Sequence, residues 1–169
     1  MCETCDGTTH EESMQGVHER IGRFGYTQMG IEADLDHPLW LFTIGLAENR
    51  AHPELSILGV PYRFGYAVLK ELADRVLEGA RFTGGEHVMA QGVYFQVEAV
   101  DPRLWDGDQF NFWKAYYWGW RDGPAPPPSA VELVLSGSQP YGHRSATARR
   151  PIAAERRTPV RPTPQRVQL

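Results

Sequence analysis

The sequence predicts a single α+β domain, with a mostly antiparallel sheet of about five strands, about three helices and a disordered C-terminal tail. Three segments have apolar residues at helical spacing, and five short runs are rich in apolar and β-branched residues. The two kinds of segment are interspersed without strict alternation, which favours an α+β domain over a doubly wound parallel sheet. We place the domain at residues 1–140 and the tail at residues 141–169.

The N-terminal part of the domain predicts a helix followed by a strand. Apolar residues recur at helical spacing over residues 11–24, a threonine at position 8 or 9 can cap this helix, and Gly25 ends it. A strand is expected at residues 26–33. Residues 34–38 then form a turn, because the proline at position 38 disfavours helical backbone at the residue before it.

Two further strands are predicted at residues 40–46 and 55–60. The polar link between them contains His52, Pro53 and Glu54, which predicts a rigid, charged turn. Ionisable side chains therefore stand beside a fixed backbone at this point.

The second half of the domain predicts two helices and two strands. A helix is expected at residues 62–79, with Gly79 as its stop, and another at residues 108–118. Strands are expected at residues 93–100 and 131–135. The apolar face of the first of these helices is formed by Tyr66, Leu69, Leu72, Ala73 and Val76, and its solvent face by Lys70, Glu71, Asp74, Arg75 and Glu78.

Charge divides the chain into an acidic body and a basic tail. Residues 141–169 contain seven Arg and one Glu, giving +6, and residues 1–140 contain twenty acidic and ten basic residues, giving −10. The tail has four prolines and few large apolar residues, so we expect it to be disordered. A solvated extension is favoured over an electrostatic arm for nucleic acid or an acidic partner, and the acidic body disfavours nucleic-acid binding elsewhere.

The composition predicts a protein of the cytoplasm that does not span a membrane. No run of eighteen apolar residues occurs, and the first twelve residues lack the basic and apolar regions of a secretory signal peptide. In the cytoplasm the two cysteines are expected to be thiols or metal ligands and not a structural disulfide.

Cys2 and Cys5 have the two-residue spacing at which both thiolates can reach one Zn²⁺ ion. A tetrahedral site needs two further ligands, and His52 is the first candidate because it lies at a turn. Zinc is therefore the one cofactor that the sequence suggests. A redox pair and two incidental thiols remain as alternatives, since half a site is a weak match.

His52 and Glu54 are also the candidate catalytic residues, because a histidine held by a carboxylate can act as a general base. A structural turn is favoured over this interpretation, since no nucleophile stands at a recognisable spacing nearby.

An aromatic run at residues 110–120 surrounds much of its predicted helix. Trp113, Tyr117 and Trp120 are the candidate residues for binding a small molecule or a protein, because one helix face cannot bury every ring. The alternative is a helix wedged between the sheet and the proline-rich loop that follows it.

The chain resembles a bacterial family known as domain of unknown function 4262. The matching segments are MCETCD at residues 1–6, FGY at 24–26, FTIGL at 42–46, HPEL at 52–55, LGVP at 58–61, the helix end at 76–79 and SQP at 138–140. After residue 100 the chain departs from the family pattern, and residues 112–124 are a rough analogue of it. The resemblance implies a shared fold and a cytoplasmic bacterial setting, and it implies no particular activity.

Two functional hypotheses follow from these residues. The first is a module that binds a small ligand or a protein, with the cysteine pair as a structural clip. The second is a metal-dependent, hydrolase-like enzyme in which Cys2, Cys5 and His52 hold the metal and Glu54 is the acid or base. The first is favoured, because few polar groups have catalytic spacing.

Overall fold

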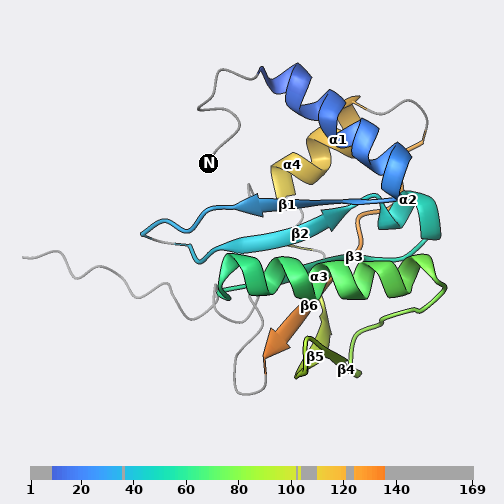
Figure 1. Ribbon diagram of the computed structural model, residues 1–169. Coiled ribbons are helices and arrows are strands. Elements are labelled where there is room, and N and C mark those ends of the chain that lie inside the picture. The colour runs from blue at the N-terminus through green and yellow to red at the C-terminus, as the bar shows by residue number, and fades with distance from the viewer. Residues whose placement is uncertain (1–8, 36, 102, 104–109, 121–123, 136–169) are drawn as a thin grey trace, which may run out of the picture.

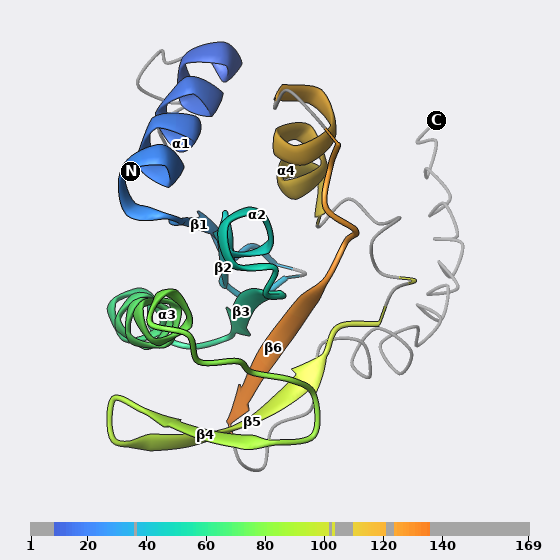
Figure 2. The same cartoon turned by 90° about the vertical axis from the view of Figure 1, so that its right-hand side faces the viewer.

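The computed structural model describes residues 9–35, 37–101, 103, 110–120 and 124–135. Six strands form one sheet in the order β1-β2-β3-β6-β5-β4, with helices on both sides of it (Figure 1, Figure 2). The strands are β1 (Thr27–Ile31), β2 (Trp40–Ile44), β3 (Glu54–Leu58), β4 (His87–Ala90), β5 (Val93–Ala99) and β6 (Ala130–Leu135). The helices are α1 (His10–Phe24), α2 (Leu46–Arg50), α3 (Tyr62–Leu77), α4 (Asn111–Lys114) and the π-helical η4 (Ala115–Trp120).

The sheet is mixed but mostly antiparallel, as predicted. β3 and β6 pair in parallel at its centre, and the other four neighbouring pairs are antiparallel. The sixth strand, β4, was not predicted and forms a hairpin with β5. Gln91 and Gly92 connect the two strands with positive φ at both residues, 49° and 73°, as a two-residue hairpin turn requires.

Helix α3 covers one face of the sheet. Its buried stripe packs against strand residues whose side chains point to that face, among them Leu41, Ile57 and Val97. The buried residues of the helix are Gly65, Val68, Leu69, Leu72, Ala73 and Val76. Tyr66, predicted for this apolar face, is 43% exposed and stacks on the neighbouring Tyr62 instead.

Helices α1 and α4, together with η4, cover the opposite face (Figure 2). Side chains alternate along a strand, so the even-numbered residues of β2 point to this face while Leu41 points to α3. The resulting cluster contains Met14, Val17, Ile21, Trp40, Phe42, Ile44, Trp113, Tyr116 and Tyr117. The domain therefore has two apolar layers separated by one sheet.

The predicted ends of α1 are confirmed. Thr9 caps the helix through a capping box with Glu12, and Gly25 ends it with a φ of 83°, which is a left-handed conformation that favours glycine. Residues 46–50, expected as the end of a strand and part of a turn, instead form the short helix α2. Helix α2 forms here because its first turn makes hydrogen bonds with Glu54, as described below.

Two sequence predictions lie outside the described residues. Residues 136–169 contain both the expected domain boundary at residue 140 and the expected disordered tail, so these stay predictions. Within the described part of the chain, no helix combines the length and the apolar character needed to cross a bilayer.

Packing of α3 predicts the effect of adding one methyl group at Gly65. A Cβ there would lie 2.7 Å from a methyl of Leu41 and 2.8 Å from a methyl of Val60. Gly65→Ala should therefore lower the free energy of unfolding by about 1–3 kcal/mol, although alanine is the better helix former. Urea denaturation measures this change.

Gly22→Ala is the matched control, since a Cβ at this helical glycine has no neighbour within 4 Å. It should raise the free energy of unfolding by up to about 1 kcal/mol. Equal effects of the two substitutions would contradict the tight contact at Gly65.

Candidate functional site

Glu54 is a buried carboxylate at the junction of four elements. Its Oε1 accepts hydrogen bonds from the backbone N–H of Gly45 at 2.9 Å, from that of Ala47 at 3.1 Å and from the Tyr117 hydroxyl at 2.8 Å. Its Oε2 accepts one from the Thr43 hydroxyl at 2.7 Å. One side chain thus joins β2, α2, β3 and η4.

The electrostatics of this junction depend on burial. Glu54 is 2% exposed, and burial raises the pKa of its carboxyl group, while its four hydrogen bonds oppose that shift. Burial, and then the neighbouring Glu54, raises the pKa of the Tyr117 hydroxyl. All four partners of Glu54 donate, so the arrangement fits a carboxylate held in place and not one presented to a substrate.

His52 is also buried, and backbone groups occupy both of its ring nitrogens. Nδ1 lies 2.6 Å from the carbonyl oxygen of Pro53, and Nε2 accepts the N–H of Phe82 at 2.8 Å. These partners require a neutral ring protonated at Nδ1. Burial accordingly lowers the pKa of His52. The histidine joins the chain after α2 to the segment after α3.

This geometry bears on the metal and catalytic predictions. Neither ring nitrogen of His52 has an open lone pair, and the described residues contain no group of three or more metal-binding side chains. Cys2 and Cys5 lie outside the described residues, so zinc binding at these positions stays a prediction. His52 and Glu54 lie close in sequence but do not bond each other in the described hydrogen-bond network.

The three aromatic candidates differ in exposure. Trp113 and Tyr117 are each 1% exposed, because the sheet and α1 enclose them, and Trp120 is half-buried against the same cluster. The expected recognition surface therefore does not include Trp113 and Tyr117. Trp118, which the sequence did not single out, is the exposed ring at 57%.

A different candidate site lies at strand β1, which forms one edge of the sheet (Figure 1). The bond from the Gly59 N–H to the Leu39 oxygen, 2.9 Å, shows that odd-numbered residues of β2 bond toward β3. Antiparallel pairing alternates, so even-numbered residues of β2 bond toward β1. Their partners in β1 are Thr27, Met29 and Ile31.

Gln28 and Gly30 therefore direct their backbone N–H and C=O groups away from the sheet. In the described part of the chain, no residue hydrogen-bonds these outward groups. The other edge differs, because the outward carbonyl of Met89 in β4 accepts a hydrogen bond from Arg75 at 3.0 Å. Strand β1 is thus an edge at which both outward residues keep their backbone groups open to another strand.

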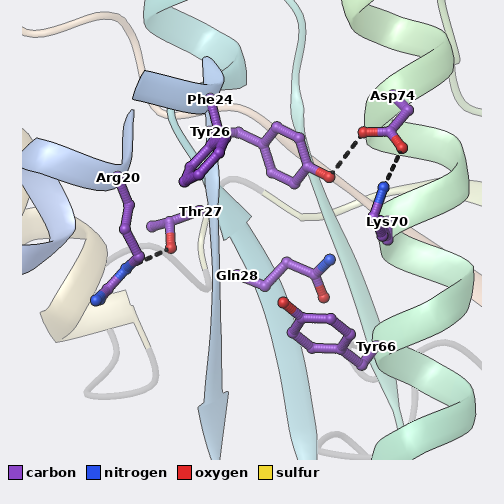
Figure 3. A pocket seen from close by; sticks show the side chains of 8 residues that line it. All are labelled: Arg20, Phe24, Tyr26, Thr27, Gln28, Tyr66, Lys70 and Asp74. Carbon is purple, nitrogen blue, oxygen red and sulfur yellow. Dashed lines mark hydrogen bonds and ion pairs between the residues drawn. The ribbon is translucent and has the colours of Figure 1, made fainter. Parts of the chain in front are cut away.

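A cavity of about 330 Å³ adjoins this edge, with α1 on one side and α3 on the other. In Figure 3, Tyr26 and Gln28 point toward α3, while Thr27 points toward α1. The lining residues are Arg20, Phe24, Tyr26, Thr27, Gln28, Tyr66, Lys70 and Asp74.

Hydrogen bonds fix several polar side chains around the cavity. The Tyr26 hydroxyl donates to Asp74 at 3.0 Å, and Lys70 bonds the other oxygen of Asp74 at 2.6 Å. Arg20 donates through Nε to the Thr27 hydroxyl at 3.1 Å. Two cations and one carboxylate leave the lining with a net charge of +1, in a domain that is acidic by sequence.

Sequence reasoning missed this site because its residues resemble ordinary helix surface. Lys70 and Asp74 were assigned to the solvent face of their helix, where an i,i+4 ion pair is common. The order of strands in a sheet is not visible in one sequence, so β1 could not be identified as an edge. Gly30, an exposed glycine inside a strand, is the signal that could have drawn attention to it.

Comparison with known proteins identifies the family to which the chain belongs. The family model described as Domain of unknown function (DUF4262) matches residues 20–140, so the chain belongs to this family. The match includes β1, the cavity and Glu54. Neither the curated proteins nor the solved structures contain a match.

Substitution of the buried Glu54 should change the stability of the protein. Glu54→Gln replaces one acceptor oxygen with an NH₂ group and breaks at least one of the four hydrogen bonds as they stand, so it should lower the free energy of unfolding by roughly 1–3 kcal/mol. The raised pKa also sets a pH dependence. The contribution of Glu54 is largest below its unfolded pKa of about 4.3 and is lost as the pH rises through its folded pKa.

The stability difference between wild type and Glu54→Gln should therefore shrink as the pH rises above about 4.3, because the glutamine does not titrate. Urea denaturation at several pH values measures it. Glu78→Gln, at an exposed position, is the control and should show little difference at any pH. A difference that grows with rising pH would contradict the raised pKa.

Proposed function

We propose that this member of the DUF4262 family is a protein-binding module that accepts an extended polypeptide segment along β1. The observation that supports this most directly is the edge itself. Gln28 and Gly30 direct unpaired backbone groups outward, beside a cavity of about 330 Å³. Main-chain hydrogen bonds would supply affinity, and the cavity would select a side chain of the bound segment.

The size and lining of the cavity fit one side chain or a small group. Ligand pockets span about 300–1,000 Å³, and this cavity is near the lower limit. The aromatic rings of Phe24 and Tyr66 line the same cavity as the polar groups of Arg20 and Lys70. The arrangement suits a segment that presents an apolar side chain and a carboxylate.

The rest of the domain favours binding over catalysis at this place. The two ionisable side chains predicted to have catalytic chemistry, His52 and Glu54, are held in buried hydrogen bonds and do not line the cavity. A metal-dependent enzyme built on Cys2 and Cys5 receives no support from the described residues. We therefore propose the binding module alone.

Selection from random peptides displayed on phage tests this function. Peptides recovered on the wild-type protein should bind Gln28→Pro at least roughly tenfold more weakly, because proline removes the outward N–H of residue 28 and places its ring there. That N–H makes no bond to β2, so the fold should be retained. Fluorescence polarisation with a labelled peptide measures the affinity.

Gln28→Ala is the matched control, because it removes the side chain and keeps the N–H. It should weaken binding of the same peptides less than Gln28→Pro does, because the main-chain hydrogen bond is kept. Recovery of no peptide, or peptides that bind Gln28→Pro as well as wild type, would overturn the proposal. In the second case, loss of binding in Tyr66→Ala would point to the cavity alone.

A further inference from the structure

We propose that β1 also pairs with β1 of a second copy of this chain, in antiparallel orientation about a two-fold axis at Met29. This inference rests on the proposed function, because it uses the same strand edge and names one occupant of it. Two six-stranded sheets would then become one continuous sheet.

The hydrogen-bonding pattern of β1 is self-complementary about Met29. A two-fold axis at this residue places Gln28 opposite Gly30 of the second copy, and Gly30 opposite Gln28. Both residues direct their N–H and C=O groups outward. Each of the two opposed pairs can exchange two hydrogen bonds, so the interface gains four and leaves none of these outward groups unpaired.

The side chains on the α1 side of the strand also fit this register. Thr27, Met29 and Ile31 point to that side, and the axis places Ile31 opposite Thr27 of the second copy. Ile31 is 40% exposed in the single chain. Pairing would cover this apolar side chain, which otherwise remains in contact with water.

On the α3 side, Gly30 presents no side chain of its own at the strand edge. Neighbouring side chains already fill the place of a Cβ there, which would lie 2.9 Å from a methyl of Leu41 and 3.6 Å from the ring of Tyr62. Tyr62 is 57% exposed and stacks on Tyr66, with ring centroids 6.1 Å apart. The stacked rings of two copies would therefore meet beside the axis, where aromatic side chains are common interface anchors.

The register about Met29 also sets which charged groups meet across the interface. Glu32 directly follows β1, is exposed, and falls opposite Tyr26 of the second copy in this register. Tyr26 lines the part of the cavity beside α3, where Lys70 is paired with Asp74, while Arg20 bonds Thr27 on the α1 side. One glutamate of each copy would thus stand on the side of the Lys70–Asp74 pair of the other, twice in each dimer.

Sedimentation equilibrium of the full chain over a range of concentrations tests the pairing. We expect a reversible dimer of the wild-type protein. Gln28→Pro should raise the dimer dissociation constant at least tenfold, and by more than Gln28→Ala, which keeps the N–H of residue 28. A wild-type protein that is monomeric throughout, or a dimer unaffected by Gln28→Pro, would overturn the inference.

Cysteine cross-linking tests the register. In a chain with Cys2→Ser and Cys5→Ser, Met29→Cys places two thiols across the axis in a non-hydrogen-bonded pair, where Cα atoms are about 4.5 Å apart and a disulfide can form. We expect a covalent dimer on mild oxidation. Gln28→Cys, whose equivalents lie offset along the strands, is the control and should cross-link much more slowly.

The outcomes separate the two proposals. A monomer that still recovers peptides sensitive to Gln28→Pro keeps the proposed function and overturns only the self-pairing. A dimer in which Met29→Cys cross-links no faster than Gln28→Cys overturns the register about Met29. A dimer with rapid Met29→Cys cross-linking supports the inference even where no peptide is recovered.

Discussion

The fold depends on one buried carboxylate. Removing a negative charge from water costs several kcal/mol unless hydrogen bonds replace the lost hydration, and no cation lies in the described bonds of Glu54. Four donors replace that hydration, from β2, from Gly45 between β2 and α2, from α2 and from η4, while Glu54 begins β3. Since each donor must be in position for the charge to be tolerated, the carboxylate fixes how these elements meet.

Several local features follow from this constraint. Gly45 has a φ of 115° and its Cβ would lie 2.9 Å from the backbone of Tyr26, so only glycine can bring its N–H to Glu54 at this approach. The five residues of α2 are too few to form a stable helix alone, and bonds from Gly45 and Ala47 to Glu54 hold its first turn. Tyr117 connects the aromatic layer to the same point.

The sequence predicted the elements better than their roles. Helical spacing identified α1 and α3 because their apolar faces pack on the sheet, and β-branched runs identified five of the six strands. Position 54 was recognised as chemically important, but a carboxylate that accepts four hydrogen bonds cannot be distinguished in sequence from a catalytic one. Its donors at residues 43 and 117 are brought together only by the tertiary fold.

The aromatic run shows a second limit of local reasoning. A helix on the surface of a domain buries one face, and on that basis several rings of this segment should be exposed. Here α1 and the sheet enclose the segment from two directions, so Trp113, Tyr116 and Tyr117 are all buried and Trp118 remains outside. The π-helical geometry of η4 also shifts the residues around the axis relative to an α-helix, which a fixed helical period cannot anticipate.

The two edges of the sheet differ in how their outward backbone groups are covered. An unpaired edge strand is prone to association, and proteins commonly block such edges with charged side chains. In β4, Arg75 occupies one of the outward groups, the carbonyl of Met89. β1 has a glutamine and a glycine at its outward positions, with cations set back in a cavity beside them. An edge left open next to a shaped, charged cavity is better explained by a strand that binds there than by incomplete protection.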